Sequence, residues 1–217
     1  MKNVIFDMDG VIFDTERLMQ KFWLMAAEEY HLPGMAEIYP SFIGKNNAGI
    51  EEALENKYGT EAPCREVIDR VVRLMRSHIR EFGPPLKPYV KELLAFLKSN
   101  GYRVALASST LTELVKSELA TAHIDTYFDA ILGGDMVQHG KPAPDIFLAA
   151  CAALGALPEE AYVVEDSFNG IRSAYAAGAK PIMVPDILQP TPEIRQLCCQ
   201  VLKNLKELEL FLKKQEN

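Results

Sequence analysis

The sequence has few of the residues that hold disulfide-rich or metal-stabilised small domains together. It contains four cysteines and four histidines in 217 residues, and no two cysteines form a Cys-x-x-Cys pair. Cys198 and Cys199 are adjacent in the chain, which is a poor arrangement for an ordinary disulfide. The histidines lack the spacing of metal ligands. We therefore expect reduced thiols in a chain long enough to fold on its hydrophobic core alone.

Long apolar runs and an excess of positive charge are also missing. The longest uncharged apolar stretch, residues 146–158, is 13 residues long, whereas a membrane-spanning helix needs about 20. Asp7 and Asp9 interrupt the apolar run at the N-terminus, which argues against a secretory signal. The net charge of −7 disfavours a nucleic-acid partner, because phosphate binding needs a basic face. These observations predict a soluble, cytoplasmic protein that binds neither membranes nor nucleic acid.

What the sequence does contain is a regular alternation of short apolar runs and helical patterns. The runs lack strict alternation of apolar and polar residues, as expected for strands buried on both faces. This pattern predicts an α/β fold, with a parallel sheet covered by helices on both faces. The expected strands are residues 3–7, 103–107, 128–132, 162–165 and 181–184.

Several helix ends carry recognisable signals. Thr191 followed by Pro192 is typical of a helix start, with threonine as the N-cap residue. Thr110 and Glu113 have the spacing of a capping box, which predicts a helix starting just after the second strand.

One interval is too long for a simple crossover between strands. About ninety residues separate the first two expected strands, although a β-α-β unit takes only about 30 in all. The excess has apolar residues at helical spacing in 16–31, 48–58 and 63–82. We expect a helical cap domain over 16–82, inserted into a core domain formed by 1–15 and 83–217. The alternative is a single domain with an elaborated first crossover.

Polar and charged residues lie at or after the carboxyl ends of four of the expected strands. Asp7 ends the first and Asp9 comes after it, Ser108 follows the second, Lys141 comes after the third, and Glu165 ends the fourth, with Asp166 next to it. Each has a structural explanation when taken alone: a turn residue, a surface charge, an acidic helix start. Ligands of open parallel sheets bind at the carboxyl ends of the strands, however, and all four groups fall at that edge. The arrangement therefore favours a single functional site.

These residue types together suit the hydrolysis of phosphate monoesters. A carboxylate nucleophile splits the reaction into two steps through an aspartyl-phosphate, and a second carboxylate can act as acid and then as base. Mg²⁺ and a lysine would offset the negative charge that the carboxylates and the phosphate bring together. A signalling receiver domain also uses an acceptor aspartate with lysine and serine or threonine. Its acceptor lies in mid-chain, whereas the candidate here is Asp7 and a helical insertion follows it.

Four segments resemble the four motifs of the haloacid dehalogenase superfamily: Asp7–Glu16, Ser108, Lys141–Asp145 and Glu165–Ser167. The similarity is greatest to the β-phosphoglucomutase-like phosphatases with a helical cap. This resemblance implies a Rossmann-like core, a cap inserted after the first strand, a Mg²⁺ cofactor and a small phosphorylated metabolite as substrate. It also suggests a monomer, which is common in the family.

The resemblance assigns roles to individual residues. Asp7 resembles the nucleophile and a metal ligand, and Asp9 the acid/base whose main-chain carbonyl also reaches the metal. Asp166 resembles the remaining metal carboxylate, with Glu165 beside it as a direct or indirect ligand. Ser108, with its neighbour Ser109, and Lys141 resemble the phosphate-binding residues.

The resemblance implies a phosphatase acting on a sugar or polyol phosphate, and leaves a phosphomutase as the alternative. Related mutases grip a second phosphate with an arginine in a cap loop; the matching segment here, 43–48, has asparagines at that point. We expect Glu16, Lys45 and Asn47 to contact the substrate from the cap. Dehalogenases lack the equivalent of Asp9, so the resemblance does not favour that activity.

Overall fold

The computed structural model describes residues 2–43, 45 and 47–215. The chain divides into two compact units. The core unit consists of Met1–Asp14 and Leu86–Asn217, and the cap unit of Thr15–Pro85.

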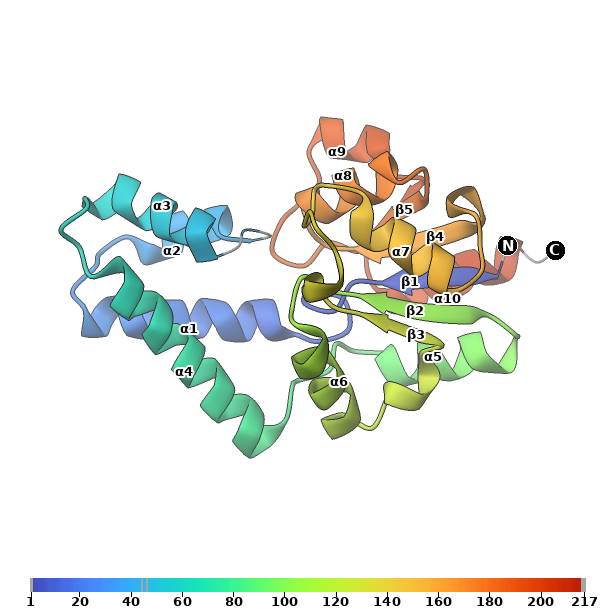
Figure 1. Ribbon diagram of the computed structural model, residues 1–217, viewed down its shortest axis with the longest axis horizontal. Coiled ribbons are helices and arrows are strands. Elements are labelled where there is room, and N and C mark those ends of the chain that lie inside the picture. The colour runs from blue at the N-terminus through green and yellow to red at the C-terminus, as the bar shows by residue number, and fades with distance from the viewer. Residues whose placement is uncertain (1, 44, 46, 216–217) are drawn as a thin grey trace. The chain divides into compact units, whose positions relative to one another are not determined.

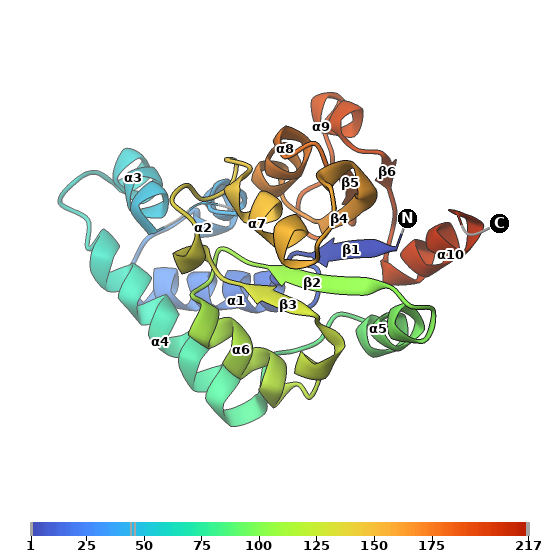
Figure 2. The ribbon, with the colours of Figure 1, turned by 45° about the vertical axis from the view of Figure 1, so that its right-hand side comes forward.

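The core unit is built on a six-stranded parallel sheet with the order β3-β2-β1-β4-β5-β6. Its two central strands, β1 and β4, are fully buried, as expected for strands covered on both faces. The sheet confirms the predicted fold class, and Figures 1 and 2 show the strands side by side. The strands are β1 (Asn3–Phe6), β2 (Arg103–Ala107), β3 (Ala130–Leu132), β4 (Ala161–Glu165), β5 (Lys180–Met183) and β6 (Gln200–Val201).

Helices cover both faces of this sheet (Figures 1 and 2). One face packs against α5 (Val90–Ser99), α6 (Thr112–Thr121) and α10 (Leu205–Gln215), whose leucines join the side chains of β1 and β2 in one apolar cluster. The other face packs against α7 (Asp145–Ala153) and α8 (Phe168–Ala176). A shorter helix, α9 (Pro192–Leu197), packs beside α8, and single 3₁₀ turns lie at Asp125–Tyr127, Gly134–Met136 and Pro158–Glu160.

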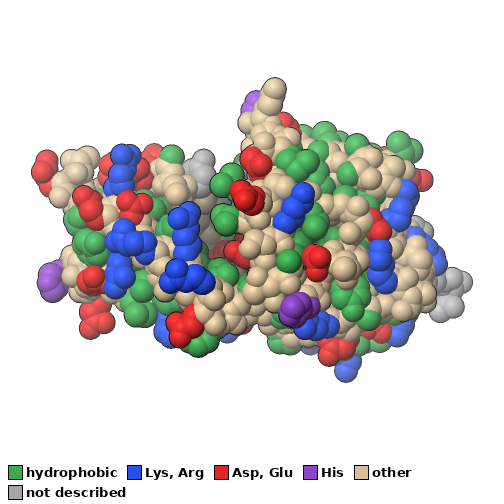
Figure 3. Space-filling view, turned by 60° about the horizontal axis from the view of Figure 1, so that its bottom comes forward, with side chains coloured by type: hydrophobic (Ala, Val, Ile, Leu, Met, Phe, Trp, Pro, Cys, Tyr) green, Lys and Arg blue, Asp and Glu red, His purple; other side chains and the backbone are tan. Residues whose placement is uncertain are grey.

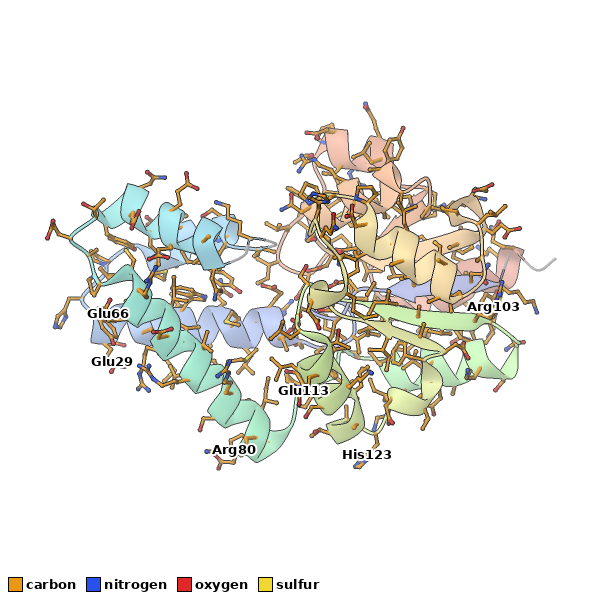
Figure 4. The ribbon with its side chains drawn as sticks, viewed as in Figure 1. Glu29, Glu66, Arg80, Arg103, Glu113 and His123 are labelled. Carbon is orange, nitrogen blue, oxygen red and sulfur yellow. The ribbon has the colours of Figure 1, made fainter. Side chains whose placement is uncertain are left out.

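Within the described residues of the cap unit, all regular structure is helical. Its two long helices, α1 and α4, pack against each other, and Glu29 on α1 accepts a 2.8 Å bond from Arg70 on α4 (Figure 4 labels Glu29). Trp23 and Phe42 contribute to its interior, with ring centroids 4.8 Å apart. The elements are α1 (Thr15–Glu29), α2 (Met35–Ile38), a 3₁₀ turn (Tyr39–Ser41), α3 (Asn47–Tyr58) and α4 (Cys64–Phe82).

The structure departs from the sequence predictions at short elements and at one helix start. No sequence signal predicts β6, two residues long, or α2, four residues long. The Thr110–Glu113 capping box is wrong: α6 starts after Leu111, which makes no side-chain cap bond. The Thr191 cap of α9 is confirmed, since its side chain accepts a bond from the Ile194 amide.

The two places where the chain leaves and re-enters the core unit lie together. Phe13 and Leu86 form an antiparallel bridge, and the Lys87 amide donates to the Ile12 carbonyl at 2.9 Å. The Lys87 ammonium lies 3.1 Å from Asp14 and 2.7 Å from Asp186, whose side chain is buried. These contacts join the two segments of the core unit at the points where the insertion begins and ends.

On the face in Figure 3, acidic and basic side chains are interspersed. Over the described residues, no helix combines the length and the apolar character needed to cross a membrane.

Candidate active site

The carboxyl ends of β1 and β4, which are adjacent in the sheet, bring three carboxylates together. Asp7 follows β1 directly, and its amide continues the ladder by donating to the Val164 carbonyl at 2.9 Å. Glu165 ends β4, and Asp166 follows it. All three are buried, and one carboxylate oxygen from each lies within 4.8 Å of the others. Two of the four predicted strand ends therefore meet at one point.

Lys141 reaches this acidic group from the loop before α7. Its ammonium donates to Asp7, to Glu165 at 2.8 Å and to the Ala107 carbonyl at 3.3 Å. The ammonium also lies 4.8 Å from the centroid of the Phe147 ring, a cation–π distance. Although 134 residues separate Lys141 from Asp7, the fold makes them direct partners.

Burial and charge shift the pKa values of this pair. Burial raises the pKa of Asp7, and the neighbouring charges of Glu165 and Asp9 add to the effect; despite the opposing charge of Lys141, the pKa reaches about 8. Burial alone would lower the pKa of Lys141, but the charges of Asp7 and Glu165 outweigh it and raise that pKa above its usual value. The lysine is therefore charged here at neutral pH. Its single positive charge is not enough to bring the pKa of Asp7 back to its usual value.

Glu165 is held rigidly by the start of α8. Its Oε2 accepts bonds from the amides of Asp166 at 3.0 Å and Ser167 at 2.9 Å, and from the Ser167 hydroxyl at 2.9 Å. Its Oε1 accepts the bond from Lys141. Both oxygens of this carboxylate are thus engaged within the protein.

A tight turn after β1 contains Asp9 and closely approaches Asp166, which follows β4. Asp9 is half-buried, and its charge contributes to the raised pKa of Asp7. Gly10, with φ at +76°, closes the turn by donating to the Phe13 carbonyl at 2.9 Å. A β-carbon at this position would lie 2.2 Å from the Asp166 carboxylate. Only glycine lets the turn approach Asp166 this closely.

Ser108 follows β2, the strand on the other side of β1. Its side chain is buried, and its Oγ accepts a 3.0 Å bond from the Thr110 amide. As an acceptor in this bond, the hydroxyl keeps its own proton for another partner. The neighbouring Ser109 is exposed.

The predicted cap residues belong to the other compact unit. Glu16 is half-buried in the first turn of α1, where it accepts a 2.9 Å bond from the buried Tyr39 hydroxyl. Lys45 is exposed and lines a depression of about 410 Å³ together with Ser41, Glu52, Asn56, Lys57, Ile38 and Ala53. Asn47 is exposed at the first residue of α3. Within the cap segment 43–48, residues 44 and 46 are outside the described part of the chain.

Two further side chains contact the site, although neither of them has a role assigned from the sequence. Ser167 fixes the Glu165 carboxylate, and a serine just before a helix is a recognisable N-cap signal. Phe147 contacts the Lys141 ammonium from α7. In the sequence Phe147 is only one apolar residue of a helix, so no pattern could assign it to the site.

The donor set suits a divalent cation that prefers oxygen ligands. Three buried carboxylates meet one lysine, and burial, followed by the charges of Glu165 and Asp9, raises the pKa of Asp7. A cation bound among Asp7, Glu165 and Asp166 would stabilise the ionised form of Asp7, and carboxylate oxygen is the ligand type that Mg²⁺ and Ca²⁺ prefer.

Several known proteins resemble the chain in sequence and in structure. The chain is 35% identical over 186 residues to a phosphorylated carbohydrates phosphatase of Thermotoga maritima, covering 84% of each protein. It is 31% identical over 205 residues to hexitol phosphatase B of Escherichia coli O157:H7, covering 93% of this chain and 89% of the relative. A crystal structure of a candidate β-phosphoglucomutase of Thermotoga maritima superposes with a TM-score of 0.78, at 29% identity and 99% coverage of both chains. The haloacid dehalogenase-like hydrolase family matches residues 1–178, and we conclude that the chain belongs to that family.

Proposed function

We propose that the protein is a Mg²⁺-dependent phosphatase that hydrolyses a small phosphorylated sugar or polyol through an aspartyl-phosphate. The observation that carries this proposal is the Lys141 ammonium between Asp7 and Glu165, at the meeting point of β1 and β4. The similarity to two phosphatases, one of phosphorylated carbohydrates and one of hexitols, supports the substrate class.

In the first step, a carboxylate oxygen of Asp7 attacks the phosphorus atom, and the bond to the leaving alcohol oxygen breaks. Lys141 and Ser108 hold the phosphoryl oxygens and offset their charge, because phosphoryl transfer depends mainly on positioning and electrostatic stabilisation. Asp9 gives its proton to the leaving oxygen, so that a neutral alcohol departs.

In the second step, Asp9 acts as the base. It takes a proton from a water molecule, which attacks the phosphorus of the aspartyl-phosphate and releases inorganic phosphate and the Asp7 carboxylate. The enzyme is then restored with Asp9 protonated again. One residue thus serves both steps, because the proton that it gives up in the first is regained in the second.

The metal would be held by the side chains of Asp7 and Asp166, the main-chain carbonyl of Asp9, and Glu165 as a direct or indirect ligand. When bound, Mg²⁺ supplies positive charge that stabilises the charge developing on the transferred phosphoryl group. Glu16, Lys45 and Asn47 of the cap would contact the sugar or polyol.

The test is phosphate release from a panel of hexitol, hexose and pentose phosphates, with Mg²⁺ or with EDTA. We expect Mg²⁺-dependent release from at least one member. Asp7→Asn should lower kcat at least about a thousandfold, because it removes the nucleophile. Asp69→Asn, an exposed aspartate of the cap unit, is the matched control and should leave kcat unchanged. Absence of release from every member by folded protein would overturn the proposal.

A second candidate, a phosphomutase, is favoured by the similarity to the candidate β-phosphoglucomutase. The same assay separates the two activities. Conversion of one sugar monophosphate into its isomer, stimulated by the sugar bisphosphate, would indicate the mutase, whereas net release of phosphate indicates the phosphatase.

A further inference from the structure

Ser167 makes two hydrogen bonds that join helix α8 to the acidic site. Its Oγ accepts a 3.0 Å bond from the Gly170 amide, the usual bond of an N-cap residue. The same hydroxyl donates at 2.9 Å to Oε2 of Glu165. A hydroxyl has one proton, and here that proton is committed to the carboxylate.

Glu165 connects the Ser167 hydroxyl to Lys141, because it accepts a hydrogen bond from each of them. With Oε2 held by three donors, the orientation of the carboxylate is fixed, and Oε1 is directed at the Lys141 ammonium 2.8 Å away. Lys141 in turn donates to Asp7. The chain of contacts therefore runs from the first turn of α8, through Ser167 and Glu165, to the lysine beside Asp7.

Gly170 provides the space that this arrangement needs. A β-carbon at position 170 would lie 1.7 Å from Oε1 and 1.9 Å from Cδ of Glu165. The helix thus approaches the carboxylate more closely than any side chain would permit. The close approach of Gly170 and the bond from Ser167 both constrain the Glu165 carboxylate, and both come from the start of α8.

We propose that Ser167 is a positioning residue, which orients Lys141 against the phosphoryl group by fixing the carboxylate of Glu165. The inference rests on the proposed phosphatase function for its catalytic consequence, but the orientation itself is a property of the protein alone. An N-cap with a purely structural role would stabilise α8 without affecting Lys141.

The variant Ser167→Ala removes both bonds of the hydroxyl, while Ser167→Thr keeps a hydroxyl at that position. Thr191→Ala is the matched control, because Thr191 caps a different helix, α9, through the Ile194 amide. Both alanine variants should lower the melting temperature through the lost cap. Only Ser167→Ala should affect Lys141.

For Ser167→Ala we expect kcat to fall about tenfold, since one of three donors to a charged group is lost. Binding of inorganic phosphate in the presence of Mg²⁺, measured by calorimetry, should weaken several-fold. Thr191→Ala should keep both values at wild-type levels, and Ser167→Thr should restore them. Wild-type kcat and phosphate affinity in folded Ser167→Ala would overturn the proposal.

A crystal structure of Ser167→Ala tests the orientation without any substrate. We expect the Glu165 carboxylate to turn and its 2.8 Å contact with Lys141 to lengthen. An unchanged contact would overturn the proposal, whatever the activity. If wild-type protein released no phosphate from any substrate, the proposed function would fail, and this structure would still decide the role of Ser167.

Discussion

At the scale of single residues, Asp7 is an acid placed where its negative charge is costly. Burial raises its pKa, Glu165 and Asp9 add to the effect, and the result is a pKa of about 8 in the absence of metal. In an unfolded chain the same group titrates near 3.8. Between about pH 4 and pH 8 the folded protein therefore binds this proton more tightly than the unfolded one.

This difference sets the direction of two pH dependences. The free energy of unfolding of the metal-free protein should decrease as pH rises from about 4 to about 8, because ionised Asp7 is disfavoured only in the folded state. Mg²⁺ must displace the proton, so its stabilising effect should grow over the same range. We expect the increase in melting temperature caused by Mg²⁺, measured by calorimetry against EDTA, to be larger at about pH 8 than at about pH 6.

Asp7→Asn supplies the control for this experiment. An amide cannot ionise, so the variant should lose both the pH dependence and most of the stabilisation by Mg²⁺. An equal effect of Mg²⁺ at both pH values in the wild-type protein would contradict the assignment of the raised pKa to Asp7.

At this scale the sequence can predict which residues meet but not how they are held. Asp7, Lys141 and Glu165 are predictable because each lies at or after the end of a recognisable strand, and parallel strands present their carboxyl ends at one edge. The engagement of both Glu165 oxygens depends on main-chain amides at the start of α8 and on the close approach of Gly170. Such distances are set by packing, and no residue pattern contains them.

At the scale of elements, the start of α6 is held by a residue that is distant in the sequence, and not by the local capping box that the sequence predicts. Asp135, from a 3₁₀ turn after β3, accepts 2.7 Å bonds from both the amide and the hydroxyl of Thr112 at the start of α6. Glu113, the acidic residue of the predicted capping box, lies in the first turn of the same helix (Figure 4). The local pattern fails because a carboxylate from another segment already satisfies the helix start.

Asp135→Ala should therefore lower the melting temperature at neutral pH, whereas Glu113→Ala should leave it nearly unchanged. Hydrogen bonds from Thr112 hold the pKa of Asp135 below its usual value of 3.8. The stabilisation is then fully present above that value and is lost as pH falls through the lowered pKa. Thermal unfolding followed at neutral and at strongly acidic pH checks both points. If Glu113→Ala lowered the melting temperature more than Asp135→Ala did, the result would support the local capping box instead.

Strands and long helices are easier to predict than short elements for a physical reason. Buried parallel strands need continuous apolar runs, and the cap helices need apolar residues at helical spacing; both leave a recognisable pattern. The two residues of β6 and the four of α2 are too few to show any period. Their structure comes from pairing with β5 and from packing near α1, which are tertiary contacts.

At the scale of the whole molecule, the core unit holds its own hydrophobic interior. The two large apolar clusters, one on each face of the sheet, consist entirely of core-unit residues. The two core segments that flank the insertion are joined by the Phe13–Leu86 bridge and by the contact of Lys87 with Asp14. Without the cap, the core unit therefore still has its own hydrophobic interior and two chain segments that already lie next to each other.

We predict that a variant with Thr15–Pro85 replaced by a short Gly-Ser linker will fold cooperatively. The two core segments that the linker would connect are already adjacent. The free-energy cost of closing a loop grows slowly with its length, by about 0.6 kcal/mol for each doubling. The acidic site should keep its stabilisation by Mg²⁺, because Asp7, Glu165 and Asp166 all belong to the core. Circular dichroism should show a single cooperative transition that shifts on addition of Mg²⁺.

The same variant tests where substrate selection resides. If Glu16, Lys45 and Asn47 select the sugar or polyol, the ratio of kcat/KM between two sugar phosphates should fall towards one when the cap is removed. A non-cooperative transition would show that the core depends on the cap for its stability. A folded variant that kept the wild-type ratio would place selection among the strand ends of the core, and would remove the three cap residues from the proposed site.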